Sequence, residues 1–121
     1  MDSKSKLEKI LEFLNAKKAK EVKVIDLKDM SILTDYFVIC GGTSTTHIKA
    51  LADGLDEMLS QEGIKYLHME GYNSARWILM DYSDVIVHIF HEQEREFYSL
   101  ERLWSAGIVS DTTENLGKSN I

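Results

Sequence analysis

The stretch RWILMDYSDVIVHIF, residues 76–90, reads as two β-strands that fold back on each other at Tyr-Ser-Asp. In a hairpin with a loop of even length, residues that pair across the strands share one face of the sheet. One face then carries aliphatic side chains, namely Ile78, Met80, Val85, Val87 and Ile89. The other face is mixed and carries Trp77, Leu79, Asp81, Ile86, His88 and Phe90. The aliphatic face predicts core, whereas the mixed face is compatible with an active site, a binding surface or a second core.

The sequence on either side of the hairpin predicts the remaining elements. Apolar residues at helical spacing predict one helix over about 3–19 and a second that begins at Thr43 or Ser44 and ends near Gly63. A last helix is predicted from Glu92 to about Ser105, and strands are predicted at residues 21–27, 35–42 and 65–70. The order α-β-β-α-β-β-β-α predicts an α/β fold, with a mixed sheet of about five strands flanked by helices.

Length and composition indicate one domain in a reducing compartment. The chain has 121 residues, and we expect a single domain over residues 1–108 followed by a polar, disordered tail over 109–121. Cys40 is the only cysteine, so no internal disulfide can form. No stretch approaches the roughly 20 apolar residues of a membrane span. We therefore expect a cytoplasmic protein that does not contact membranes.

The net charge of −6 limits the kind of partner. Proteins that grip nucleic acid do so with clustered lysine and arginine, so an acidic domain is a poor candidate for extensive RNA binding. Opposite potentials speed the encounter of two proteins and suppress wrong docking. The composition therefore favours a basic protein partner, with little direct RNA contact.

The predicted last helix carries an outward-facing tyrosine, Tyr98. Arg95 and Arg102 lie on the same side of this helix, three residues before it and four after it. An exposed tyrosine between two arginines is typical of an interface hot spot. The alternative is an ordinary solvated face on which the arginines pair weakly with Glu92 and Glu101. Residue types alone support core and docking equally for the mixed face of the hairpin, and this helix favours docking.

Three features invite an enzymatic interpretation, and each is weak. The segment 41–44, Gly-Gly-Thr-Ser, lacks the lysine of a nucleotide-binding loop. Asp81 and Asp84 straddle a turn, where a metal-dependent transferase would place two carboxylates side by side. His88 lies on the mixed face while His91 begins the next element, so shared zinc ligation is not favoured. We expect no catalytic residue, no metal and no cofactor, and keep a nucleotide- or metal-dependent transferase as the alternative.

Four stretches carry a resemblance to a known family: SILTDYFVICGGTSTTH at 31–47, KALADGLDE at 49–57, EGYNSARWILMDYSDVIVHIF at 70–90 and REFYSLERLW at 95–104. In this order they resemble the ribosomal silencing factor family, the Iojap-related proteins, over residues 5–106. The family pattern has arginine where Thr46 stands and glycine where Ser83 stands. The first departure weakens a polar contact beside His47. The second bears on the hairpin turn, because serine tolerates positive φ less readily than glycine.

The resemblance implies a protein that acts by obstruction. Family members bind the large ribosomal subunit through a protein of its intersubunit face, the fourteenth in standard numbering, and block docking of the small subunit. This represses translation when nutrients are scarce. The resemblance also implies a sheet similar to that of nucleotidyltransferases but without their catalytic aspartates, and a homodimer when the protein is free. With the mixed face in view, the expected partner-binding residues are the apolar anchors Trp77, Phe90 and Tyr98 and the polar contacts Asp81, Asp84, His88 and Arg95.

Overall fold

The computed structural model describes residues 1–92 and 108–111. Its elements are α1 (Ser3–Ala16), β1 (Lys20–Asp26), β2 (Tyr36–Gly42), α2 (Thr45–Gln61), β3 (His68–Glu70), β4 (Trp77–Asp81), β5 (Val85–His91) and β6 (Ile108–Asp111). The predicted last helix lies outside the described residues, as do Arg95 and Tyr98. Within the described residues, no helix is both long enough and apolar enough to cross a membrane.

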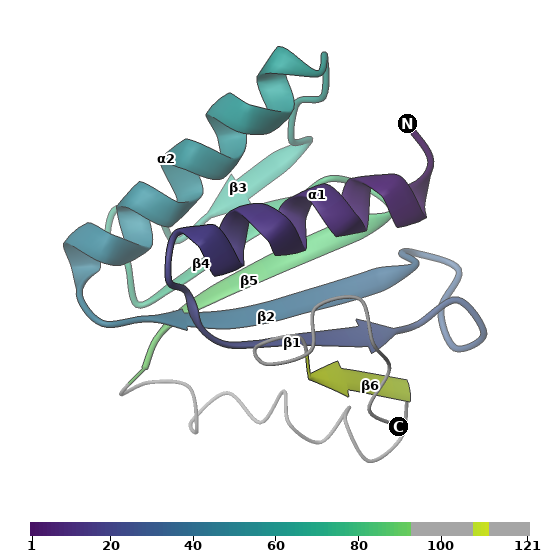
Figure 1. Cartoon of the computed structure of the whole chain (residues 1–121), viewed down its shortest axis with the longest axis horizontal. Helices are drawn as coiled ribbons and strands as arrows, with labels where there is room; N and C mark the ends of the chain where they lie inside the picture. Colours follow the sequence, from purple (N-terminus) through teal and green to yellow (C-terminus); the bar gives the residue numbers. More distant parts are fainter. Residues whose placement is uncertain (93–107, 112–121) are drawn as a thin grey trace.

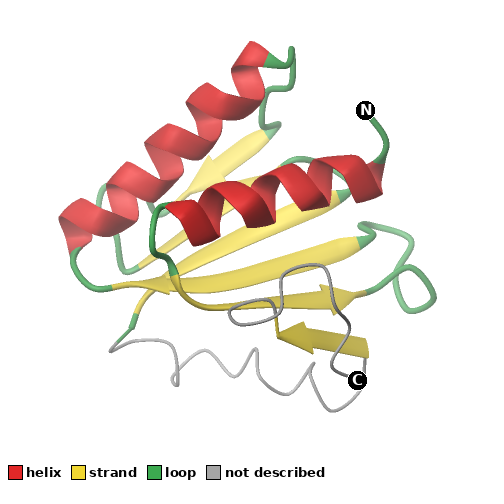
Figure 2. Cartoon of the chain, viewed as in Figure 1, coloured by secondary structure: helices red, strands yellow, loops and turns green. Residues whose placement is uncertain are grey.

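The strands form one mixed sheet in the order β3-β4-β5-β2-β1-β6. The central pair β2–β5 is parallel, and every other neighbouring pair is antiparallel. Both helices lie on the same face of this sheet (Figure 1; Figure 2). The predicted α/β class is confirmed, as is the central position of the strand predicted at 35–42.

The sixth strand corrects the predicted tail. β6 pairs with β1 in an antiparallel register that aligns Val24 with Ser110 and Asp26 with Ile108. Residues 109–111 therefore belong to the sheet, and the predicted boundary at residue 108 is wrong for them. The physical reason is that β1 would otherwise be an edge strand with unpaired backbone groups, which a short segment of extended chain can satisfy.

The two helices end in the same way, although only one end was predictable. Gly63 takes φ +76°, and the N–H groups of Gly63 and Ile64 donate to the carbonyls of Ser60 and Leu59. This is the Schellman motif that a glycine at this position predicts. At the end of α1 the same two bonds form around Lys18, which takes φ +63° without being glycine. The predicted helix over 3–19 therefore stops at Ala16.

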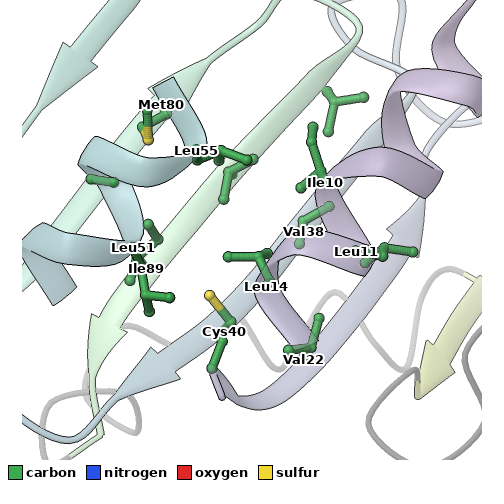
Figure 3. Packing of buried hydrophobic residues seen from close by; sticks show 14 of the residues in the cluster. Ile10, Leu11, Leu14, Val22, Val38, Cys40, Leu51, Leu55, Met80 and Ile89 are labelled. Carbon is green, nitrogen blue, oxygen red and sulfur yellow. The ribbon is translucent and has the colours of Figure 1, made fainter. Parts of the chain in front are cut away.

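The main core lies between the helices and the sheet (Figure 3). The buried stripes of both helices have the predicted spacing: Leu7, Ile10, Leu11 and Leu14 on α1, and Ile48, Leu51, Ala52, Leu55 and Leu59 on α2. The aliphatic face of the hairpin packs against them, with Ile78, Met80, Val85, Val87 and Ile89 all fully buried. The helices approach each other closely at Gly54, where an added Cβ would lie 2.5 Å from Phe13 Cζ. The core assignment of this face is confirmed.

A strained turn closes the hairpin. The Asp84 N–H donates to the Tyr82 carbonyl at 3.1 Å, and Ser83 between them takes φ +76°. This hydrogen bond and this φ define a γ-turn of the rare, strained kind. The Asp81 carboxylate supports the turn by accepting from the Ser83 N–H at 2.7 Å. Serine thus occupies a backbone position that favours glycine.

We expect Ser83→Gly to stabilise the protein by about 0.5–1 kcal/mol, because relief of the left-handed strain exceeds the entropy that glycine adds to the unfolded chain. Urea unfolding followed by circular dichroism measures the change. Ser74→Gly is the matched control, since Ser74 is not at positive φ and glycine there should be neutral or destabilising. Equal effects of the two substitutions would show that Ser83 is not strained.

Candidate docking surface

The strand register defines a second face of the sheet, the one directed away from α1 and α2. Across β4–β5, Trp77 pairs with Phe90, Leu79 with His88 and Asp81 with Ile86. Across β5–β2, Ile86 pairs with Phe37 and His88 with Ile39. The mixed face predicted for the hairpin therefore exists, and it continues over β2.

The part of the second face near β1 is closed. Ile25, Leu27, Ile39 and Phe90 form a small buried cluster, and Phe90 has no exposed surface. This corrects the expectation that Phe90 is an exposed anchor. Phe90 pairs with Gly41, which has no side chain, and stacks on the Trp77 ring at 5.0 Å between centroids. The phenyl ring is therefore a core group that supports Trp77.

His88 is also interior, with 4% of its surface exposed. Its Nδ1 accepts a hydrogen bond from the Trp77 indole N–H at 3.1 Å, and its ring meets the edge of Phe37 at 4.7 Å. Burial lowers the pKa of His88 from 6.5 to about 4, so the ring is neutral near pH 7 with its proton on Nε2. The expectation that His88 contacts a partner is corrected: it orients Trp77 instead.

The part of the second face near β3 keeps an accessible apolar strip. We define this apolar strip as four half-buried side chains from three strands: Phe37, Trp77, Leu79 and Ile86. Its border is polar, because β3 pairs with β4 so that His68 stands opposite Asp81 and Glu70 opposite Leu79. His68 and Glu70 are exposed and contact each other. A hydrophobic centre with a polar border is the usual anatomy of a protein interface.

The two aspartates of the hairpin have separate structural tasks. Asp84 accepts from Lys6 Nζ of α1 at 2.6 Å, and its carbonyl accepts from the N–H groups of Asp35 and Tyr36. It therefore fastens the turn to α1 and β2, and because its side chain remains partly exposed, its place among the expected partner contacts stays a prediction. Asp81 stays half-exposed on the second face. In the ranges 1–92 and 108–111, no group of three potential ligands could hold a metal ion.

The other features considered for chemistry also have structural roles. Gly42 is required by packing, since a Cβ there would lie 2.6 Å from Ile48 Cγ1. Ser44 caps α2 by accepting from the His47 N–H at 3.0 Å. His88 faces the second face, whereas His91, three residues later in β5, faces the opposite side. The segment 41–44 thus serves the strand-to-helix connection.

Phe37 belongs to the strip although the sequence does not predict it there, and Leu79 and Ile86 belong to it in addition to the predicted anchor Trp77. The sequence predicted the strand of Phe37 but not its neighbour in the sheet. Only the parallel β2–β5 register brings Phe37 beside Ile86. No local pattern in the sequence encodes that pairing.

We expect acid to destabilise the fold through His88. The unfolded ring binds a proton near pH 6.5 and the folded ring only near pH 4, so stability is fully present above pH 6.5 and is lost as pH falls toward 4. The loss is on the order of 3 kcal/mol. Thermal melts of the wild type and His88→Gln across this range should show a shallower pH dependence for the variant. Parallel curves would indicate that His88 titrates normally.

Comparison with known proteins agrees with the fold. A crystal structure of a Chromobacterium violaceum protein superposes with a TM-score of 0.82 at 28% sequence identity, covering 87% of this chain and 88% of that one. The superposition therefore includes most of this chain.

Sequence comparison identifies the family. The family model described as "Ribosomal silencing factor during starvation" (RsfS) matches residues 1–120. The ribosomal silencing factor RsfS of Halalkalibacterium halodurans is 38% identical over 104 residues, covering 86% of this chain and 89% of the relative. A mouse protein named mitochondrial assembly of ribosomal large subunit protein 1 is 31% identical over 106 residues, covering 85% of this chain and 46% of the relative. This chain belongs to the ribosomal silencing factor (RsfS) family.

Proposed function

We propose that this protein silences ribosomes by binding the large subunit at its intersubunit face, where it blocks joining of the small subunit and so represses translation. The contact is with a ribosomal protein, the fourteenth of the large subunit. The observation that carries the proposal is the half-buried apolar strip with its polar border, in a chain of the RsfS family. The names of two relatives, which refer to ribosomal silencing and to the ribosomal large subunit, support it.

Obstruction needs only a bound object of sufficient size. A 121-residue domain has a radius of gyration of about 14 Å, which is large relative to the gap between two closely joined surfaces. A stable interface of standard size buries about 800 Å² per partner, which we propose is built from the second face of the hairpin together with the predicted last helix. No bond has to form or break, so the protein acts as a stoichiometric inhibitor and not as an enzyme.

Electrostatics favours a basic partner. The chain has a net charge of −6, and Asp81 and Glu70 border the apolar strip. Ribosomal proteins are typically basic, so these carboxylates steer the encounter and oppose docking in a wrong register. The apolar strip then supplies most of the binding free energy, because few side chains dominate an interface and aromatic residues are enriched among them.

Trp77 is the anchor that the structure supports best among the expected site residues. Its indole is held by the hydrogen bond to His88 and by stacking on Phe90, so little conformational entropy is lost when a partner packs on it. Arg95 and Tyr98 remain proposed contacts on the segment outside the described residues. We also propose that the free protein forms a homodimer through the apolar strip, and that it acts in the cytoplasm with the ribosomes.

We expect the purified protein to shift joined ribosomes toward free subunits in a sedimentation gradient without added nucleotide. Leu79→Asp places a charge in the apolar strip, and Trp77→Ala and Tyr98→Ala remove anchors. Each should weaken binding by about 2 kcal/mol, roughly 30-fold, and abolish the shift at low protein concentration.

Ile32→Asp is the matched control for Leu79→Asp, because Ile32 is fully exposed on the β1–β2 loop and the charge change is the same. Thermal melts of all variants separate loss of binding from loss of folding. The proposal fails if joined ribosomes persist at saturating wild-type protein, or if Leu79→Asp and Ile32→Asp behave alike.

A further inference from the structure

Four of the seven residues from Lys17 to Lys23 are lysines, at the point where α1 ends and β1 begins. We call Lys17, Lys18, Lys20 and Lys23 the lysine corner. Such a concentration of positive charge is unexpected in a chain of net charge −6. A binding site for a partner requires that the fold place these lysines close together and leave them exposed.

A β-bulge brings two of them to the same face. Lys20 pairs with Gly41 and Lys23 with Ile39, so three steps along β1 match only two along β2. In a regular strand, residues three apart point to opposite faces. The extra residue reverses this alternation, so Lys20 joins Lys23 on the second face. A Cβ placed on Gly41 would indeed lie 3.7 Å from Lys20 Cβ.

Two residues of the corner that are not glycine have a left-handed backbone conformation. Glu21, in the bulge, takes φ +46°, and Lys18, two residues after the end of α1, takes φ +63°. Each left-handed position costs on the order of 1 kcal/mol for a residue with a side chain. Bulges commonly redirect side chains at functional sites. The corner therefore has its present shape at some expense of stability.

Three of the corner's four lysines keep their charge available, and a binding site would rest on these three. Lys17, Lys18 and Lys20 are exposed, and within residues 1–92 and 108–111 no ion pair joins them to a carboxylate. The acidic residues beside the corner are Glu21, Glu92 and Asp111, the last of which pairs with Lys23 across β1 and β6, so its four lysines exceed the nearby carboxylates by one. The first turn of α2, which is tied to the corner by the His47 Nε2 bond to the Lys17 carbonyl at 3.1 Å, carries no acidic residue.

The corner also adjoins the apolar strip. Lys20, Gly41, Phe90 and Trp77 form one row across four adjacent strands. At about 4.8 Å between strands, Lys20 stands roughly 14 Å from Trp77 on the same side of the sheet. When a partner covers the apolar strip, the molecules next to that partner on the ribosome lie beside the lysine corner.

We propose that the lysine corner binds backbone phosphates of RNA beside the protein on which the apolar strip docks. This proposal rests on the proposed function, since the large subunit presents RNA around its surface proteins. Exposed lysines suit phosphate as point charges and read no sequence. The corner adds a salt-sensitive contact at the edge of an interface whose centre is protein on protein.

The test compares the binding of full-length variants to purified large subunits at several salt concentrations. The corner variant carries three substitutions, Lys17→Gln, Lys18→Gln and Lys20→Gln. Its slope of log affinity against log salt concentration should be smaller than that of the wild type by about two, because each lost phosphate contact removes about 0.7–0.9 from the slope. Affinity at low salt should drop roughly tenfold or more. The control Lys4→Gln/Lys9→Gln/Lys65→Gln loses the same charge elsewhere and should keep the wild-type slope, and arginine at positions 17, 18 and 20 should restore it.

A second arm measures binding to the isolated fourteenth large-subunit protein, without RNA. The corner variant should bind it as the wild type does, whereas Leu79→Asp should not. Loss of this binding in the corner variant would mean that the lysines contact protein, and would overturn the RNA assignment. If the corner variant keeps the wild-type salt slope on whole subunits while Leu79→Asp still weakens binding, the lysine proposal alone is overturned. Subunit binding that does not depend on Leu79 contradicts the proposed function instead.

Discussion

The cross-strand register of β4, β5 and β2 is the constraint on which the rest of the structure depends. Side chains alternate between faces with a period of two, so a slip of one residue would move Leu79 and Trp77 into the main core and Ile78 and Met80 to the surface. The strained turn at Ser83 fixes the register at one end, and the ion pair of Asp84 with Lys6 fastens that end to α1. One hairpin therefore supplies both the core that folds the protein and the surface proposed to dock it.

Much of this arrangement could be predicted from the sequence because it is local. Helical spacing located α1 and α2, alternation located the strands, and pairing across the hairpin sorted its faces. The errors involve contacts between segments that are distant in the sequence. Phe90 is buried because it packs with Ile25, Leu27 and Ile39, which are distant in the sequence, and Phe37 reaches the strip because β2 runs parallel to β5. β6 was missed because it forms on an edge that only the assembled sheet presents.

The candidate site was predicted less well than the fold, for a related reason. An aromatic residue on a mixed face can be an anchor or a support, and its sequence position does not distinguish the two. Trp77 is half-exposed while Phe90 and His88 hold it from below. The three residues thus form one unit, in which two members position the third. The left-handed backbone conformations of Lys18 and Glu21 could not be predicted either, because neither residue is glycine.

We expect a two-part interface, with an apolar centre that supplies affinity and charged borders of opposite sign. The most direct measurement is the structure of the protein bound to the large ribosomal subunit. We expect the second face to lie against a protein of the intersubunit surface, with Trp77 and Leu79 covered and with α1 and α2 turned toward solvent. A complex in which the helices make the contact and the apolar strip stays uncovered would contradict it.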